Sequence, residues 1–182
     1  MMKKTAIAIL FVIVIVGAIT AYTYGMRYIG SGQPPVMAAP ETQATRVFID
    51  KSDRNLTLLR DDQVIMSVPV SLGAVPQGHK VQEGDERTPV GTYQIDWRNQ
   101  NSVAHLSLHI SYPNAADTAN AAKLGVSAGG NIMIHGIANG WGFLGKLHRK
   151  WDWTNGCIAV TNEEMQKIWS LVPDGTPIEI VE

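Results

Sequence analysis

The sequence predicts a mainly β domain, a β-sandwich or open barrel with one or two short helices, behind an N-terminal transmembrane helix. Two observations carry this prediction: short strand-forming runs recur between residues 45 and 182, and an uncharged apolar run opens the chain. With 182 residues, 45% of them hydrophobic and 17% charged, the chain has the composition of one folded domain and not of a disordered protein. Its single cysteine excludes an internal disulfide and a Cys-rich zinc module.

The N-terminal run has the length and the flanking charges of a membrane helix. Residues 5–24 contain no charged side chain, and Lys3 and Lys4 precede them. About 20 helical residues at ~1.5 Å each match a bilayer core of about 30 Å, and the two lysines keep the N-terminus in the cytoplasm. A cleaved signal peptide, cut near Ala18 or Gly25, is the alternative, but the apolar run exceeds the usual h-region of about 7–15 residues. We favour an uncleaved anchor, and both alternatives place the domain outside the cytoplasm.

The chain divides into three parts by composition. Residues 1–25 are the membrane anchor or signal sequence, residues 26–44 are rich in Gly, Pro and Ala and predict a flexible linker, and residues 45–182 form the folded domain. The 157 residues after the anchor hold 13 Lys and Arg against 16 Asp and Glu, a net charge of −3. Because such a domain offers no basic field, we expect no nucleic-acid partner.

The strand-forming runs of the domain are rich in β-branched and aromatic residues and are separated by turn residues. Between the first two runs, Ser-Asp-Arg-Asn suits a turn. Pro69 indicates that the third run ends on an edge strand or at a bulge, because proline cannot donate to the hydrogen-bond ladder. The predicted runs are 46–50, 56–60, 64–72, 92–97, 106–111, 131–137 and 177–181.

Two helices are predicted among the strands. Thr161 and Glu164 stand three residues apart, as the N-cap and third position of a capping box do. Apolar residues follow at i, i+3, i+4 and i+7, a stripe that packs on a sheet, and Pro173 ends this helix. A weaker helix is predicted over residues 115–124 and is closed by Gly125. The stripe consists of Met165, Ile168, Trp169 and Val172.

Cys157 is the first candidate for chemistry. Gly156 before it allows a sharp turn, and the apolar residues after it predict a short buried strand. The thiol would then lie at the mouth of that strand, with neighbouring backbone N–H groups facing a ligand. The alternative is an inert cysteine that packs as a small hydrophobe. An unpaired thiol in an oxidising compartment is an oxidation liability, which favours a chemical role.

His135 is the candidate base. It follows three apolar residues and precedes Gly136, a pattern that places an imidazole at the end of a strand. A cysteine nucleophile needs such an imidazole within hydrogen-bond reach, whereas the alternative is a structural histidine bonded to backbone. A zinc site built from His135, His148, Asp152 and Cys157 lacks the ligand spacing of zinc proteins. Nothing in the sequence requires a metal or an organic cofactor.

Three pieces of the sequence, taken together, resemble the L,D-transpeptidase catalytic domain family, which has the YkuD-like fold. HG at residues 135–136, followed by TNGCI at residues 154–158, is similar to the family's HG and [S/T]-x-G-C-[I/V] signature. Upstream, GDERTPVGTY at residues 84–93 resembles its T-P-x-G-x-[F/Y] segment. The resemblance covers roughly residues 46–182, nearly the whole folded part.

The resemblance implies a cysteine acyltransferase that acts on peptidoglycan stem peptides on the periplasmic side of the inner membrane, in the bacterial cell envelope. Carried over by position, Cys157 is the nucleophile, His135 donates and accepts the proton, and the Gly136 carbonyl orients the imidazole. The backbone amides around Cys157 would hold the oxyanion. A thioester at the third stem residue would then pass to an amine of a second stem, or to water. The resemblance assigns the contacts with the oxyanion and the substrate to Thr154, Asn155 and Gly156.

Two positions depart from the family's commoner pattern. Asn155 replaces a second histidine, and Ala159 replaces an arginine that suits a substrate carboxylate. Arg87, Arg149 or Lys150 would have to supply that charge instead. These departures resemble members that hydrolyse links between peptidoglycan and proteins, so one alternative is a hydrolase of stem peptides or of their lipoprotein attachments. A catalytically silent cell-wall-binding domain is the other.

The long connection between the two motifs carries its own alternatives. Trp141, Trp151 and Trp153 lie in it beside several glycines. They either form a Gly-hinged lid over an extended substrate or bury the connection itself.

Overall fold

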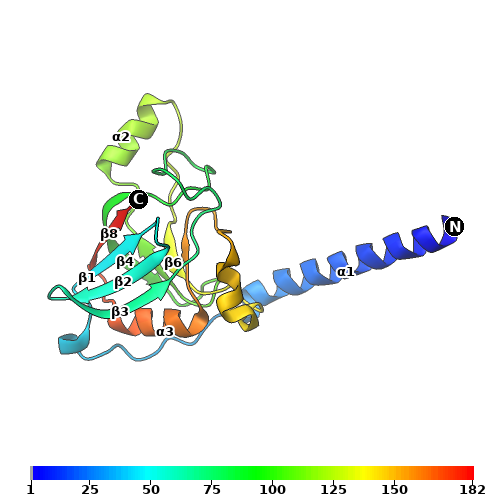
Figure 1. Cartoon of the computed structure of the whole chain (residues 1–182), viewed down its shortest axis with the longest axis horizontal. Coiled ribbons are helices and arrows are strands. Elements are labelled where there is room, and N and C mark those ends of the chain that lie inside the picture. The colour runs from blue at the N-terminus through cyan, green and yellow to red at the C-terminus, as the bar shows by residue number, and fades with distance from the viewer. Residues whose placement is uncertain (1) are drawn as a thin grey trace.

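The structure is a computed structural model that describes residues 2–182, and it confirms the mainly β fold class. Within the described residues an eight-stranded sheet curves into a half-barrel, with α3 (Asn162–Leu171) below it and α2 (Ala115–Lys123) beyond its opposite end (Figure 1). The strands are β1 (Arg46–Asp50), β2 (Asn55–Arg60), β3 (Gln63–Pro69), β4 (Gly91–Asn99), β5 (Ser107–Ile110), β6 (Met133–His135), β7 (Ile158–Ala159) and β8 (Pro177–Val181).

The strand order across the sheet is β3-β2-β1-β8-β4-β5-β6-β7. Neighbouring strands run antiparallel, except that β1 with β8 and β6 with β7 are parallel. The two edges of the sheet meet at one point, because Ser71, just after β3, exchanges backbone hydrogen bonds of 2.8 and 2.9 Å with Ala159 of β7. The sheet is thereby curled, with β7 at the closing seam.

Two predicted strands are shorter than expected. The run 131–137 contributes only β6, because Asn131 has a left-handed φ of 55° that interrupts the extended backbone before it. The run 64–72 ends as β3 at Pro69, on an edge strand as the proline indicated. The other predicted runs agree with β1, β2, β4, β5 and β8 to within two residues, and the short strand expected after Cys157 is β7.

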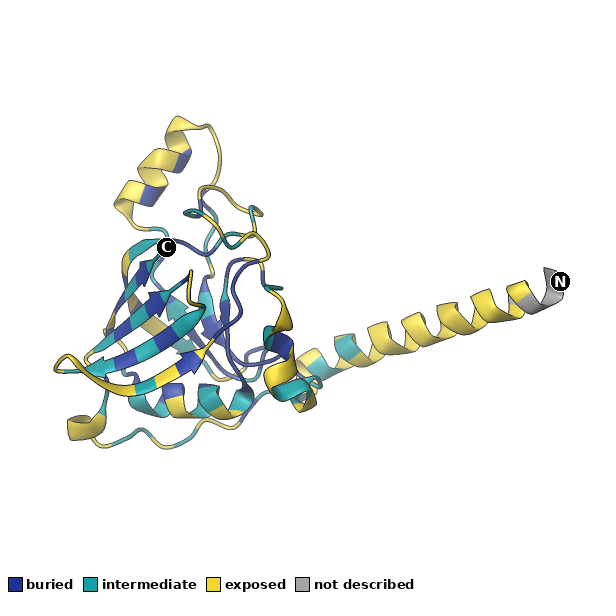
Figure 2. Cartoon of the chain, viewed as in Figure 1, coloured by how far each residue is buried: buried dark blue, intermediate teal, exposed yellow. Residues whose placement is uncertain are grey.

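The hydrophobic core lies inside the half-barrel, where alternate residues of the strands are buried (Figure 2). Val47 and Ile49 of β1 and Leu56 and Leu58 of β2 have no exposed surface. Each such side chain contributes about 1.5–3 kcal/mol relative to an exposed one. One face of the sheet is therefore committed to the core, and the other is available for polar side chains.

Both predicted helices form where the sequence places them. Thr161 Oγ1 accepts the Glu164 N–H at 3.3 Å, and the Glu164 carboxylate accepts the Thr161 N–H at 3.0 Å, so the capping box is confirmed. Met165, Ile168 and Trp169 of α3 are buried against the sheet, as the stripe predicts. α2 begins at a second capping box, which Asn114 and Asp117 form.

The N-terminal helix α1 (Met2–Ile29) projects from the domain and is exposed along most of its length (Figures 1 and 2). Its segment Ile7–Ile29 is long and apolar enough to cross a membrane, a property that signal sequences share.

The segment after α1, where composition predicts a flexible linker, is bonded to the domain at several points. Ala38 N–H donates to Ser170 O at 2.9 Å, and Ala44 N–H donates to Leu171 O at 2.8 Å. Its extended backbone offers amides that pair with carbonyls of the domain. Residues 26–29 of the predicted linker belong to α1, and the remainder is bonded to the domain, with residues 33–44 along α3.

Candidate active site

The parallel pair β6 and β7 brings His135 and Cys157 to one face of the sheet. His135 pairs with Ala159 in the register of the two strands, and Cys157 precedes Ala159 by two residues. Because side chains alternate along a strand, Cys157 and His135 point to the same side. Ile134 and Ile158 point to the other side and are fully buried in the core. The motif residues, 22 positions apart in sequence, are thus diagonal neighbours in space.

His135 is oriented by the backbone next to it. Its Nδ1 lies 2.6 Å from Gly136 O. Since a carbonyl only accepts, Nδ1 carries the proton and Nε2 is the basic nitrogen. Burial lowers the pKa of His135, and the Gly136 carbonyl opposes this effect. The imidazole is therefore neutral at pH 7 and can accept a proton through Nε2.

Cys157 is half-buried, and its thiol reaches Asn131 O at 3.6 Å. Burial raises the pKa of this thiol, while the Met133 backbone N–H and the Lys80 ammonium oppose the rise. The resting pair is then a protonated thiol beside a neutral imidazole. Such a pair needs proton transfer to Nε2 at the moment of attack and does not hold a preformed thiolate.

The turn before Cys157 is held by Thr154. Thr154 Oγ1 donates to Cys157 O at 2.7 Å and accepts the Gly156 N–H at 3.2 Å. The Gly156 amide, expected to face the oxyanion, is therefore already engaged inside the turn. Gly156 has a φ of +111°, and a Cβ there would lie 2.5 Å from Arg87 O, so glycine is required at this position. Asn155 is exposed and lines the cavity described next.

The upstream motif forms the wall behind this turn. Thr88 Oγ1 accepts the Gly73 N–H at 3.1 Å, and the Arg87 carbonyl packs against Gly156. The loop carrying both is held by Asp85, which accepts hydrogen bonds from Lys80 and from backbone N–H groups. Partial burial raises the pKa of Asp85, but these bonds outweigh it and lower the pKa to about 2. The motif thus supports the cysteine turn without contributing a titrating group to the cavity.

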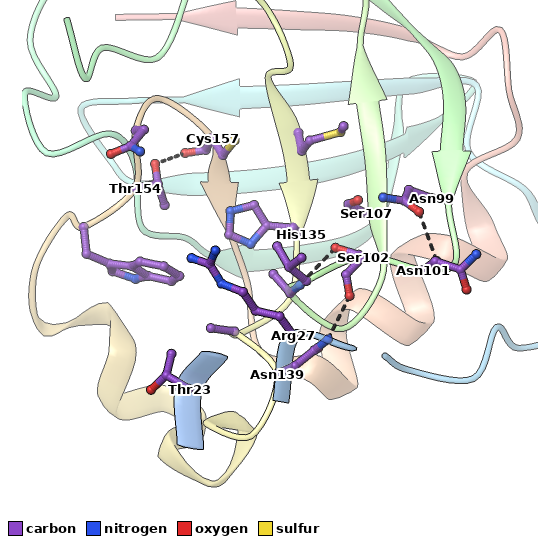
Figure 3. A pocket seen from close by; sticks show the side chains of 16 residues that line it. Thr23, Arg27, Asn99, Asn101, Ser102, Ser107, His135, Asn139, Thr154 and Cys157 are labelled. Carbon is purple, nitrogen blue, oxygen red and sulfur yellow. Dashed lines mark hydrogen bonds between the residues drawn. The ribbon is translucent and has the colours of Figure 1, made fainter. Parts of the chain in front are cut away.

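His135 and Cys157 open into one cavity of 440 Å³ (Figure 3). Asn99, Ser102 and Asn139 give it a polar side, and Met133 and Trp153 an apolar one. Among the described residues, no group of three or more His, Cys, Asp or Glu side chains is placed to hold a metal ion. The arrangement suits an extended polar substrate with a reactive carbonyl held between thiol and imidazole.

Comparison with known proteins now gives the family. Residues 44–180 match the family model described as "YkuD: L,D-transpeptidase catalytic domain". The chain belongs to the L,D-transpeptidase family.

Solved structures agree on the fold. The helical cell shape determining protein Pgp2 of Campylobacter jejuni (K307A mutant) is 22% identical, with a TM-score of 0.58 over 88% of this chain and 53% of its own. Bd1075 of Bdellovibrio bacteriovorus is 22% identical, with a TM-score of 0.52 over 84% and 53%. The L,D-transpeptidase LdtMt1 with imipenem is 18% identical, with a TM-score of 0.51 over 76% and 59%. The chain therefore spans a little over half of each of these structures. No curated protein matches its sequence.

The arginine that many family members have at the position of Ala159 is not replaced by any of the three residues predicted to supply its charge. Ala159 is fully buried, and none of the three predicted substitutes is among the described residues that line the cavity. Arg149 forms an ion pair with Glu164. The cation that does line the cavity is Arg27, at the end of α1, and no motif in the sequence indicated it.

Two further residues beside the site were named in the sequence analysis without a link to His135. His148, considered there only as part of a zinc site, is 3% exposed, and burial lowers its pKa to about 4. Trp153 Nε1–H donates to His148 Nδ1 at 3.4 Å, and the Trp153 ring meets the His135 ring edge to face at 5.8 Å. Trp153 also separates the cavity from a smaller apolar one of 210 Å³. Trp153 therefore packs against His135 at the wall of the cavity.

Proposed function

We propose that the protein is a peptidoglycan L,D-transpeptidase that works through a thioester on Cys157. The observation that supports this most directly is the placement of Cys157 and His135 on one face of β6 and β7, opening into the same cavity. A free, half-buried thiol beside a neutral, oriented imidazole is the arrangement that acyl transfer through cysteine requires.

In the proposed reaction, Cys157 makes and breaks the covalent bond to the substrate, and His135 transfers the protons. Cys157 Sγ attacks the carbonyl carbon of the third stem residue while its proton moves to His135 Nε2. The C–N bond to the terminal D-Ala then breaks, and His135 returns the proton to the leaving amine. An amine of a second stem attacks the thioester carbon and passes a proton to His135. The C–S bond then breaks, and His135 returns the proton to Cys157 Sγ, which restores the thiol. The Cys157 backbone N–H is the candidate donor to the oxyanion, since the Gly156 N–H is engaged by Thr154.

The place of action in this proposal is the cell envelope, on the periplasmic side of the inner membrane. The apolar segment Ile7–Ile29 of α1, with two lysines preceding it in the sequence, supports a single-pass anchor. The substrate is the peptidoglycan stem peptide, which this face of the membrane makes available.

Thiol reactivity separates an enzyme from a silent binding domain. Since Cys157 is the chain's single cysteine, alkylation of the whole protein by iodoacetamide reports on this site alone. We expect alkylation near pH 7, and His135→Gln slows it about tenfold or more because the base is lost. His109→Gln is the matched control, because His109 lies on β5 and stacks on Trp97. A Cys157 thiol that stays unmodified in the native protein would contradict the proposal.

Product analysis separates transfer from hydrolysis. The full-length protein is incubated with a disaccharide-tetrapeptide, and the products are weighed by mass spectrometry. Dimers formed with loss of D-Ala support the transpeptidase. Tripeptide monomers alone support a hydrolase, the alternative that the alanine at position 159 keeps open.

A further inference from the structure

The C-terminal end of α1 packs against the connection between β6 and β7. Tyr22 donates its hydroxyl to Gly140 O at 2.9 Å, and Trp141 Nε1–H donates to Thr23 Oγ1 at 3.1 Å. The Tyr22 and Trp141 rings meet edge to face at 6.0 Å. A Cβ at Gly140 would lie 2.6 Å from Met26 Cγ, so the helix can approach this closely only because the residue is glycine. The helix end is therefore held by several specific contacts.

The chain is also held directly after the helix. Ser31 Oγ donates to Ser102 O at 3.2 Å, and Gly32 N–H donates to His105 O at 2.8 Å. Contacts on both sides of Arg27 thus hold its backbone beside the cavity. The Arg27 side chain projects from α1 into that cavity (Figure 3).

Among the described residues that line the cavity, no acidic side chain offsets the positive charge of Arg27. Arg27 lines the cavity together with His135 and Cys157. Within residues 2–182, the structure gives the Arg27 guanidinium no hydrogen bond or ion pair. A guanidinium without a partner in a concave site attracts an anion and holds a carboxylate through two parallel hydrogen bonds.

We propose that Arg27 binds a carboxylate of the substrate beside Cys157, so that the end of α1 completes the active site. The inference rests on the proposed function, because a stem peptide presents carboxylates close to the bond that Cys157 would attack. Arg27 lies outside residues 44–180, the part that matches the family. The binding charge therefore comes from the last turn of α1 and not from the catalytic domain.

The test compares two alkylating agents that differ in charge, iodoacetate and iodoacetamide, on the full chain in detergent. The ratio of their rates at Cys157 cancels any change in the thiolate fraction and reports the field at the thiol. In Arg27→Gln we expect the iodoacetate to iodoacetamide ratio to fall about three- to tenfold, as one charge several ångströms away in a partly solvated site should produce. Arg27→Lys should keep the ratio within about twofold, because the positive charge stays. Lys123→Gln is the control, because it removes the same charge from the exposed end of α2.

The outcomes separate this inference from the proposed function. If both agents modify Cys157 and Arg27→Gln leaves the ratio unchanged, or Lys123→Gln lowers it equally, Arg27 has no such role and the thiol chemistry stands. If neither agent modifies Cys157, the proposed function fails and this inference fails with it.

Substrates with one carboxylate converted to an amide identify the group that is bound. With the wild-type protein, amidating the bound carboxylate raises KM, and with Arg27→Gln the same amidation changes KM little. Amidating the terminal D-Ala and amidating the side chain of the diamino acid are tested separately. A KM that responds to neither amidation would overturn the assignment.

Discussion

The strands β1 and β2 and the connection between β6 and β7 both contain buried side chains, but these are held in different ways. In the strands, Leu56 and Leu58 are fully enclosed among other aliphatic side chains. In the connection, Asn139 and His148 are buried polar side chains. Asn139 accepts the His105 N–H at 2.7 Å and donates to Ser102 O at 2.9 Å. Nonspecific burial stabilises the first region, whereas directed hydrogen bonds orient the second.

This difference indicates which substitutions should change stability and which should change function. A side chain that fills the core contributes to the free energy of unfolding, while one held by the connection contributes to the geometry of the cavity. Asp152 shows how the two regions are joined, since its carboxylate accepts from Arg54, in the turn before β2, and from the Leu72 N–H at 2.9 Å.

The largest expected effect comes from Cys157→Ala. Product formation from a disaccharide-tetrapeptide should fall by about 10³-fold or more, because no other thiol is present to form the thioester. The free energy of unfolding should change by less than about 1 kcal/mol, since the side chain is small and only half-buried. Mass spectrometry of products and urea denaturation measure the two quantities. Activity within tenfold of wild type would contradict the role of the thiol.

Ile134→Ala, on the neighbouring strand β6, should have the opposite signature. Ile134 is fully buried behind His135, so its truncation should lower the free energy of unfolding by about 2–5 kcal/mol. Met133→Ala on the cavity side is the control and should cost less, because Met133 is only half-buried. Urea denaturation of both variants checks this. Equal losses would mean that the two faces of β6 are not distinct.

The buried histidine of the connection predicts a pH dependence. Burial lowers the pKa of His148 from 6.5 to about 4, so between these values the unfolded chain binds more protons than the folded one. Stability is therefore full above pH 6.5 and is lost as the pH falls toward 4, by about 1–3 kcal/mol. Denaturation midpoints at pH 7 and pH 4.5 measure the loss.

His148→Gln is the matched variant for that experiment. It should have a smaller difference between the two pH values than the wild type, with a remainder from His135, whose pKa burial also lowers. An unchanged difference would show that His148 is not the group responsible.

The smallest expected effect is at the cap of α3, a feature of local sequence only. Thr161→Ala removes the side chain that accepts the Glu164 N–H and should lower the free energy of unfolding by about 1 kcal/mol. Thr161→Ser, which keeps the hydroxyl, should stay within a few tenths of wild type. Thermal unfolding compares the two, and equal destabilisation would exclude the capping contribution.

Much of this molecule was predictable because its signals are local. Runs of β-branched and aromatic residues between turn residues located the strands, and the Thr161 box located α3. The resemblance of the two motifs to the family signature pointed to a pair formed by His135 and Cys157. The shortening of the run 131–137 was not predictable, because the left-handed φ of Asn131 depends on its surroundings. The engagement of the Gly156 amide by Thr154 was missed for the same reason.

The sequence by itself determined the class of fold, the family and the two residues most suited to the chemistry. These follow from hydrophobic periodicity and from short motifs, which chain neighbours encode. The tertiary structure alone decided that Arg27, 130 residues before Cys157, lines the same cavity, and that His148 is buried against Trp153. Their places depend on how α1 and the connection pack against the sheet, and packing between distant segments leaves no periodic trace in a single sequence.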